Sequence, residues 1–202
     1  MAPPPPDALG TTAGDDRPGP AGERAAPEGG GAPVEAPEAV RTRAAGIRLL
    51  CLDVDGVLTD GSLYWSEGGG WSQRFSVRDG FGVRLAQQAG IEVAILSGGD
   101  IRSARARAES LAIRHARFGV VDKVAAYHEL SALLGVGADQ TAYMGDELVD
   151  LPLLRLCRFS ATVPDAVDEV RAAVHYVTRR PAGAGAVREV GDLLCAARGA
   201  GG

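Results

Sequence analysis

The fold of this chain is decided at residues 49–60, which run Leu49-Leu50-Cys51-Leu52-Asp53-Val54-Asp55-Gly56-Val57-Leu58-Thr59-Asp60. A continuous apolar run that ends at a turn signal is typical of a strand buried on both faces of a parallel sheet. Ligands of open α/β sheets bind beyond the carboxyl ends of the strands, and Asp53 and Asp55 follow this strand directly. Because two carboxylates at such a place repel each other and lose hydration, a divalent cation, a shared proton or a nearby cation must compensate them.

The first 45 residues differ in composition from the rest of the 202-residue chain. They contain nine of its twelve prolines and no aromatic residue, so they cannot bury enough apolar surface to offset the entropy of ordering. We predict a disordered tail over residues 1–45, which leaves open a short helical turn at residues 37–45. We predict a single folded domain over residues 46–200.

Charge and hydropathy exclude two classes of partner. The formal net charge is −5 and no basic patch stands out, so we expect no nucleic-acid binding. No apolar run approaches the length that spans a bilayer, and the first residues lack the pattern of a secretory signal, so we expect no membrane partner. Cys51, Cys157 and Cys195 are widely spaced in apolar surroundings, which indicates reduced, buried thiols in a cytoplasmic protein.

Strand and helix patterns alternate after the first strand. Residues 61–75 alternate around a Glu67-Gly68-Gly69-Gly70 turn and predict a β-hairpin. Further strands are predicted at residues 91–96, 115–120, 141–144, 159–163 and 176–178, and helices at residues 80–89, 101–111, 123–134, 148–156, 165–174 and 186–198. This alternation with short connections predicts an α/β fold, a Rossmann-like three-layer parallel sheet with helices on both faces.

Polar residues that follow the predicted strands should share one crevice, because the carboxyl ends of parallel strands meet at one edge of the sheet. They are Asp53, Asp55, Ser97, Asp146, Glu147 and Asp150. Lys123 joins them because it is the only lysine in the chain, beside twenty arginines. Such a sequence keeps lysine where a compact ammonium on a flexible stem is required; the alternative is chance retention at the start of a surface helix.

This set of residues predicts a phosphoryl-transfer site. An acidic cluster suits a hard divalent cation, with Mg²⁺ the first choice. One aspartate can attack phosphorus to form an aspartyl phosphate, and the second can protonate the leaving oxygen and later activate water. A hydroxyl and an ammonium can bind the phosphoryl oxygens. For the aspartate pair alone, a metal site for nucleotide sugars and a helix-capping aspartate remain alternatives, whereas Val57 and Leu58 exclude a calcium loop.

Four motifs, in order, resemble those of the haloacid dehalogenase superfamily: residues 53–60, Ser97, Lys123 and Gly145-Asp146-Glu147-Leu148-Val149-Asp150. Residues 75–80, 150–152 and 185–190 are similar to its 3-deoxy-D-manno-octulosonate 8-phosphate phosphatases. The resemblance covers about residues 47–198 and implies a fold without a cap domain, a magnesium cofactor, and hydrolysis of that sugar phosphate on the route to lipopolysaccharide. It also implies a homotetramer in which the hairpin helps close a neighbour's site, where exposed Tyr64, Trp65 and Trp71 would suit an interface.

The resemblance also implies a role for each matched residue. Asp53 is then the nucleophile and a metal ligand, and Asp55 is the general acid/base, whose backbone carbonyl binds the metal. Asp146 is the remaining metal ligand, and Asp150 supports Lys123 or the metal. The phosphoryl group is bound by Ser97, Gly98 and Lys123.

Two positions depart from the family pattern. Gly99 and Ala184 stand where the family usually has arginine, the natural bidentate partner of a carboxylate or phosphate. Arg78 is the first candidate to bind substrate in their place, with Arg102 and Arg188 as further candidates. The alternative substrate is a nine-carbon nonulosonate phosphate or another small phosphomonoester. An alternative of a different class is a non-catalytic oligomerisation module like the C-terminal domain of acylneuraminate cytidylyltransferases, against which the intact aspartates and lysine argue.

Overall fold

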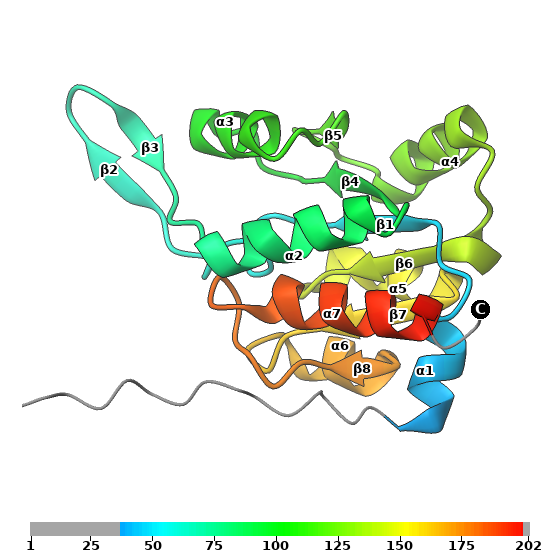
Figure 1. Ribbon diagram of the computed structural model, residues 1–202. Coiled ribbons are helices and arrows are strands. Elements are labelled where there is room, and N and C mark those ends of the chain that lie inside the picture. Colours follow the sequence, from blue (N-terminus) through cyan, green and yellow to red (C-terminus); the bar gives the residue numbers. More distant parts are fainter. Residues whose placement is uncertain (1–36, 200–202) are drawn as a thin grey trace, which may run out of the picture. The chain divides into compact units, whose positions relative to one another are not determined.

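The computed structural model describes residues 37–199, and the part of the predicted tail before residue 37 lies outside this range. Its core is a six-stranded sheet with the order β5-β4-β1-β6-β7-β8 (Figure 1). All neighbouring strands of this sheet are parallel, which confirms the predicted α/β fold. The strands are β1 (Leu49–Leu52), β4 (Glu92–Leu96), β5 (His115–Arg117), β6 (Thr141–Met144), β7 (Phe159–Thr162) and β8 (Tyr176–Val177).

The apolar strand β1 occupies the centre of the sheet. Each of its four residues is at most 1% exposed, and it pairs with β4 on one side and β6 on the other. The order of the strands therefore reverses at β1, and the crevice beyond such a switch point is where open α/β sheets bind ligands. Asp53 extends the ladder, because its backbone N–H donates to the carbonyl of Met144 at 3.0 Å.

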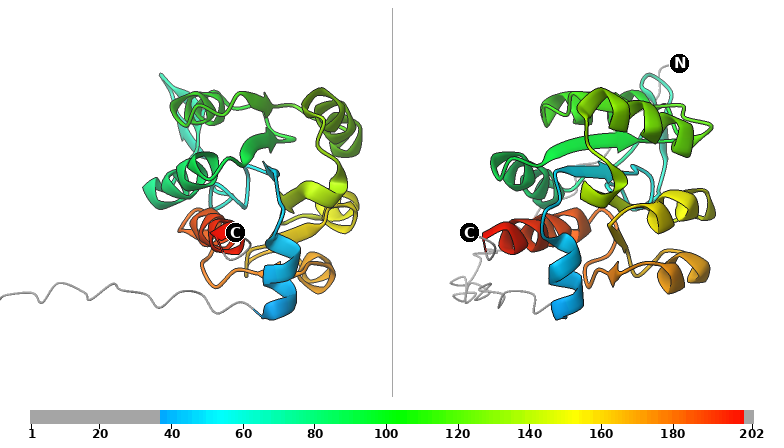
Figure 2. Two further views of the ribbon diagram at one scale, coloured as in Figure 1. Left: turned by 45° about the vertical axis from the view of Figure 1, so that its right-hand side comes forward. Right: turned by 90° about the vertical axis from the view of Figure 1, so that its right-hand side faces the viewer.

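Helices cover both faces of the sheet (Figure 2), with α2, α3 and α7 on one face and α4, α5 and α6 on the other. Their bounds are α2 (Val77–Gln88), α3 (Arg102–Ser110), α4 (Lys123–Leu134), α5 (Leu151–Leu156), α6 (Asp168–Ala173) and α7 (Ala186–Gly199). Two 3₁₀ turns, η1 (Ala138–Gln140) and η2 (Leu148–Asp150), lie before β6 and before α5. The helix predicted at residues 148–156 is thus divided between η2 and α5.

Helix α2 begins earlier than predicted. The predicted start was Gly80, but the hydroxyl of Ser76 accepts from the backbone N–H of Arg78 at 3.1 Å and starts the helix at Val77. A serine in this position satisfies an N–H group that the first helical turn leaves without a partner. The earlier start places Arg78 in the first turn of α2, where its side chain is exposed.

Helices α2 and α7 pack closely, and the loop before α7 is held by two buried carboxylates. A Cβ atom at Gly82 would lie 2.5 Å from the Cα of Arg188, so only glycine permits this approach. Asp79 accepts from the backbone N–H groups of Gly185 and Arg188, both at 3.1 Å. Glu189 accepts from the backbone N–H of Arg179 at 3.0 Å. These bonds fix the loop between β8 and α7 against α2.

A β-hairpin of β2 (Tyr64–Ser66) and β3 (Gly70–Ser72) follows β1, as predicted, and projects beside α3 (Figure 1). The chain forms no cap domain between β1 and α2, which also confirms the prediction for this described segment. Trp65 and Trp71 are opposite each other on the two strands, with ring centroids 5.1 Å apart. Both rings and the ring of Tyr64 are about half exposed, at 60%, 52% and 49%.

The folded part of the chain begins before the predicted boundary at residue 46. Helix α1 (Glu38–Ala44) buries Val40 and Ala44, which lie four residues apart on one helical face and contact the core. Arg158 donates to the carbonyl of Arg43 at 3.0 Å and ties α1 to the body. The helical turn that the sequence left open at residues 37–45 is therefore present as α1, and its apolar face joins the core.

The three cysteines are free thiols, as predicted, but they are not equally buried. Cys51 and Cys157 are buried, whereas Cys195 is only partly covered. Burial raises the pKa of the Cys157 thiol to about 12, which keeps it protonated and unreactive. Within residues 37–199, no helix combines the length and the apolar character needed to cross a membrane.

Candidate active site

A cavity of about 440 Å³ opens at the carboxyl edge of the sheet, beyond β1. Its acidic lining residues are Asp53, Asp55, Asp60, Asp146, Glu147 and Asp165. Among residues 37–199, Lys123 is the only basic residue that lines it. Two of the acids follow β1 and two follow β6, so the crevice predicted from the strand ends is present.

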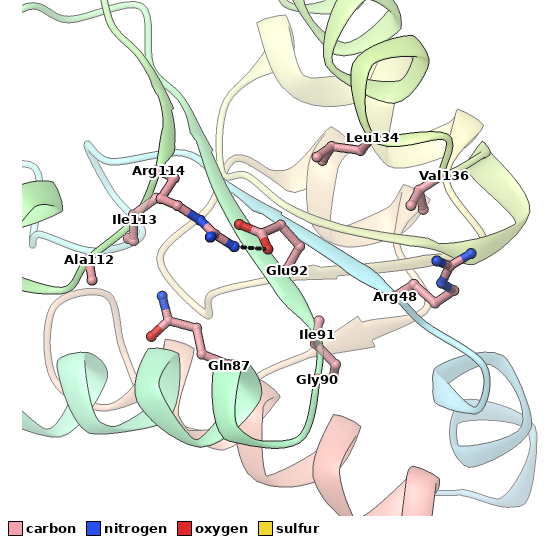
Figure 3. Close-up of a pocket in the computed structure, with 10 residues that line it drawn as sticks. All are labelled: Arg48, Gln87, Gly90, Ile91, Glu92, Ala112, Ile113, Arg114, Leu134 and Val136. Carbon is pink, nitrogen blue, oxygen red and sulfur yellow. Dashed lines mark hydrogen bonds and ion pairs between the residues drawn. The ribbon is translucent and has the colours of Figure 1, made fainter.

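A larger cavity, of about 620 Å³, lies at the opposite edge of the sheet, near the amino ends of β4 and β5 (Figure 3). Glu92 is the only acidic residue of the described part of the chain that lines it, and it pairs with Arg114 at 3.1 Å. The Arg114 side chain is 76% exposed, so this pair faces solvent. Because no group of convergent acids lines the larger cavity, the smaller one is the candidate active site.

Lys123 is the first residue of α4, and its ammonium lies between two carboxylates. Asp122 caps the helix by accepting from two backbone N–H groups of its first turn, at 3.0 and 2.9 Å. The Nζ atom of Lys123 is 2.7 Å from Oδ2 of Asp53 and 2.7 Å from Oδ1 of Asp150. Burial alone would lower the pKa of Lys123, but the two carboxylates outweigh it and raise that pKa. The only lysine of the chain is therefore part of the site and not a chance survivor on a surface helix.

Asp150 is fully buried, and both of its oxygens have partners. Its Oδ1 accepts from Lys123 and from the hydroxyl of Tyr143 at 2.6 Å. Its Oδ2 accepts from the backbone N–H groups of Asp146 at 3.1 Å and Glu147 at 3.2 Å. Asp150 therefore positions Lys123 and the loop after β6, which favours the first of the two roles predicted for it. The contribution of Tyr143 was not predicted, because a tyrosine inside a buried strand has no pattern that separates it from the core.

Asp53 and Asp146 offer the oxygens that a metal ion could use. Carboxylate oxygens of Asp53, Asp146 and Asp150 lie within 4.8 Å of one another. The Oδ1 atom of Asp146 is buried and has no hydrogen-bond partner among the described residues. A hard divalent cation with oxygen ligands fits this donor set, because it would pair with that oxygen and relieve the repulsion between the carboxylates. Gly56 makes room for the cluster, since a Cβ atom there would lie 2.0 Å from Oδ2 of Asp146.

Burial and the closeness of these acids raise the pKa values of two of them. Burial, followed by the charges of Asp53 and Asp150, raises the pKa of Asp146 to about 7. Burial also raises the pKa of Asp53 to about 6, although the ammonium of Lys123 opposes the shift. In the metal-free protein both acids therefore lose their protons at a higher pH than an ordinary aspartate does.

We expect Asp146→Asn to stabilise the metal-free protein at high pH but not at low pH. Between the ordinary pKa of an aspartate and the raised value, the folded state binds more protons than the unfolded state, so the free energy of unfolding falls as pH rises. Asparagine cannot ionise and removes this loss. At pH 8 the free energy of unfolding of the variant should exceed that of the wild type by on the order of 2 kcal/mol, a figure reduced from the full pKa shift because Asp146 is partly exposed to solvent. Urea denaturation in a chelator at pH 5 and pH 8 measures the difference. A difference that is the same at both pH values would contradict the assignment.

Asp55 lines the cavity and is held by residues that the sequence did not single out. Its Oδ1 accepts from the amide Nε2 of Gln73, and Oε1 of Gln73 accepts from the hydroxyl of Ser103 at 3.1 Å. Gln73 lies between β3 and α2, and Ser103 lies in the first turn of α3. No local pattern could have identified either residue, because the contact depends on how the hairpin arm lies against α3.

The predicted phosphate-binding residues differ in their positions. Gly98 and Gly99 line the cavity, but Ser97 does not. Ser97 is 1% exposed, and its hydroxyl accepts from the backbone N–H of Gly99 at 3.2 Å. Arg78 is exposed and does not line the cavity either. Arg188, the further candidate on α7, pairs with Asp192 at 2.8 Å.

A parallel sheet that holds a buried lysine between aspartates beyond its central strand is the construction of the haloacid dehalogenase-like hydrolases. The model of a family described as haloacid dehalogenase-like hydrolase matches residues 117–190. The 3-deoxy-D-manno-octulosonate 8-phosphate phosphatase KdsC of Yersinia pestis is 45% identical over 156 residues, which cover 77% of this chain and 83% of that protein. The chain therefore belongs to the 3-deoxy-D-manno-octulosonate 8-phosphate phosphatase family.

Solved structures agree with this assignment. A phosphatase of the same description from Moraxella catarrhalis, in complex with a magnesium ion, a phosphate ion and a KDO molecule, is 36% identical and superposes with a TM-score of 0.77. That match covers 79% of this chain and 92% of the other. The cobalt-bound phosphatase of Haemophilus influenzae is 41% identical, with a TM-score of 0.74 and coverage of 78% and 92%.

Proposed function

We propose that this chain is a magnesium-dependent phosphomonoester hydrolase that converts 3-deoxy-D-manno-octulosonate 8-phosphate to the free sugar acid and inorganic phosphate. The observation that carries the proposal is the placement of Lys123 between Asp53 and Asp150 beside the unpartnered oxygen of Asp146. Such a cluster suits a cation and an anionic phosphoryl group together. The names of the relatives supply the sugar phosphate.

In the proposed reaction Asp53 is the nucleophile. An Asp53 oxygen attacks phosphorus, the bond from phosphorus to the sugar oxygen breaks, and Asp55 gives its proton to that leaving oxygen. Asp55 then takes a proton from water, whose oxygen attacks the aspartyl phosphate and releases phosphate and the free Asp53 carboxylate. Lys123 balances the charge that gathers on the phosphoryl oxygens, and Gly98, which lines the cavity, would offer its backbone to them.

Asp53 and Asp146 would hold the magnesium ion through their carboxylates, and Asp55 through its backbone carbonyl. The ion supplies the positive charge that lets a carboxylate approach an anionic phosphate. The unpartnered oxygen of Asp146 and the raised pKa values of both acids support these ligands. Asp150 is left out of the set because its oxygens are already engaged.

A second candidate substrate is a nine-carbon acid-sugar phosphate. The nine-carbon candidate is favoured by Gly99 and Ala184, which stand where the family usually has arginine. Without those arginines, Lys123 is the only basic residue among residues 37–199 that lines the cavity. Rejection of either sugar would then depend on cavity shape more than on a charge pair with the sugar carboxylate.

The test is phosphate release from a panel of three substrates by the full chain with magnesium. We expect kcat/KM for the eight-carbon sugar acid phosphate to exceed that for a nine-carbon acid-sugar phosphate and a neutral hexose phosphate by about tenfold or more. Chelation of magnesium should abolish release. A preference for the nine-carbon substrate would establish the second candidate. The absence of release from every substrate would favour the non-catalytic oligomerisation module.

We also propose that the enzyme is a cytoplasmic homotetramer. The exposed rings of Tyr64, Trp65 and Trp71 on the hairpin support an interface between copies, since large aromatic residues are enriched at such surfaces. Three free thiols support a reducing compartment. Light scattering of the purified chain measures the assembly.

A further inference from the structure

We infer that Gln73 is a positioning residue for Asp55, which it holds by a hydrogen bond that Ser103 in turn orients. The inference rests on the proposed function, in which Asp55 protonates the leaving oxygen. It assigns a part in the chemistry to the base of the hairpin and to α3, neither of which supplies a catalytic group.

The hydrogen bonds fix the orientation of the Gln73 amide. An ionised Asp55 can only accept, so the amide nitrogen of Gln73 must face it. The opposite end of the amide, Oε1, accepts from the Ser103 hydroxyl at 3.1 Å. A glutamine with both ends engaged loses the freedom to turn its amide. It therefore presents a donor to Oδ1 of Asp55 in one fixed place.

The other side of the Asp55 carboxylate is kept open by Gly99. A Cβ atom at residue 99 would lie 2.9 Å from Oδ2 of Asp55, so any side chain there would displace the carboxylate or have to shift itself. Oδ1 is thus occupied by Gln73, while Oδ2 faces bare backbone at the cavity wall. This leaves Oδ2 as the atom that gives and takes the proton.

The same arm of the hairpin is attached to the loop after β1 at a second point. Arg74, the residue after Gln73, pairs with Asp60 at 2.6 Å. Residues 73 and 74 therefore contact both ends of the segment from Asp55 to Asp60. The hairpin arm is fixed to the acid/base loop, so its amide can serve as a stationary partner of Asp55.

The role predicts a loss that depends on the leaving group. A sugar alkoxide must be protonated as it departs, whereas the weakly basic phenolate of p-nitrophenyl phosphate departs without a proton. A misplaced Asp55 should therefore slow the first substrate and not the second. Damage to the fold, to Asp53 or to the metal ligands would slow both substrates alike.

The experiment compares kcat/KM for the eight-carbon sugar phosphate and for p-nitrophenyl phosphate in the full chain with magnesium. We expect Gln73→Leu to lower kcat/KM for the sugar phosphate by about 10–100-fold and for p-nitrophenyl phosphate by less than about threefold. Gln73→Glu, of the same shape but without the donor, should lose at least as much on the sugar phosphate. Ser103→Ala should show a smaller loss of the same kind, and Ser103→Thr, which keeps the hydroxyl, should restore the wild-type ratio.

Ser72→Ala is the matched control, because Ser72 lies on the same arm and bonds only the backbone of Tyr64 at 3.4 Å. It should leave both substrates unchanged. Equal losses on both substrates for the Gln73 variants, or no loss on the sugar phosphate, would overturn the inference. Asp53→Asn, measured in parallel, separates the two failures. If Asp53→Asn retains turnover, the proposed mechanism with Asp53 as nucleophile fails. If Asp53→Asn is inactive and the Gln73 variants behave like the wild type on both substrates, only the role of Gln73 is rejected.

Discussion

Replacing Asp53 with asparagine should abolish magnesium-dependent phosphate release, with kcat lowered on the order of 10⁴-fold or more, because an amide cannot form the aspartyl phosphate. The fold should survive. Asparagine can still accept from the backbone N–H of Val54, as Asp53 does at 2.7 Å, and Lys123 keeps its contact with Asp150. Steady-state phosphate release and a urea denaturation curve measure the two effects.

The informative comparison is with Asp55→Asn. That variant keeps the nucleophile and should retain some reaction with p-nitrophenyl phosphate in the first turnover, which a chain without Asp53 cannot do. If Asp53→Asn released phosphate at a rate near that of the wild type, Asp53 would not be the nucleophile. If Asp53→Asn failed to fold, Asp53→Glu would be compared with the wild type instead, because it keeps the charge but moves the attacking oxygen.

The second large effect is expected from Lys123→Met, and it concerns stability as much as activity. The substitution leaves the fully buried Asp150 and the nearly buried Asp53 without their common cation. Removal of one partner from a buried ion pair costs about 3–5 kcal/mol, because the remaining charge has neither water nor a counter-ion. Urea denaturation should show this loss, and phosphate release should fall with it.

A double variant separates the charge effect from the packing effect. Lys123→Met with Asp150→Asn removes the stranded charge, so it should be more stable than Lys123→Met alone although it carries one more change. Lys123→Arg keeps the charge but replaces a compact ammonium with a planar guanidinium, and should fold while losing most activity. If the double variant were no more stable than the single one, the ion pair would not explain the role of Lys123.

The parts of the site that could be predicted from sequence are those that strand ends determine. Asp53 follows β1 directly and Asp146 follows β6 after one glycine, so the parallel sheet brings them together. Lys123 was found because its residue type is rare in this chain, and the cap by Asp122 fixes its place on α4. The burial of β1 on both faces of the sheet followed from its unbroken apolar run.

What could not be predicted depends on contacts between distant segments. Gln73 reaches Asp55 only because the hairpin arm lies against α3, and nothing in residues 61–75 specifies that approach. Arg78 was a candidate to replace the two missing arginines, and the structure places it exposed in the first turn of α2, outside the cavity lining. Helix α1 is too short for propensity alone to reveal it, since its stability comes from packing against the body.

The close packing of α7 on α2 bears on the order in which the cavity is completed during synthesis. The β8–α7 loop contributes Ala182 to the cavity wall, and the bonds from Asp79 and Glu189 hold that loop only once α7 is in place. Asp53, the proposed nucleophile, is translated early, directly after β1, whereas Ala182 is held in the cavity wall only with the residues of α7. A chain that is still being synthesised therefore lacks this part of the cavity wall until the residues of α7 have emerged from the ribosome.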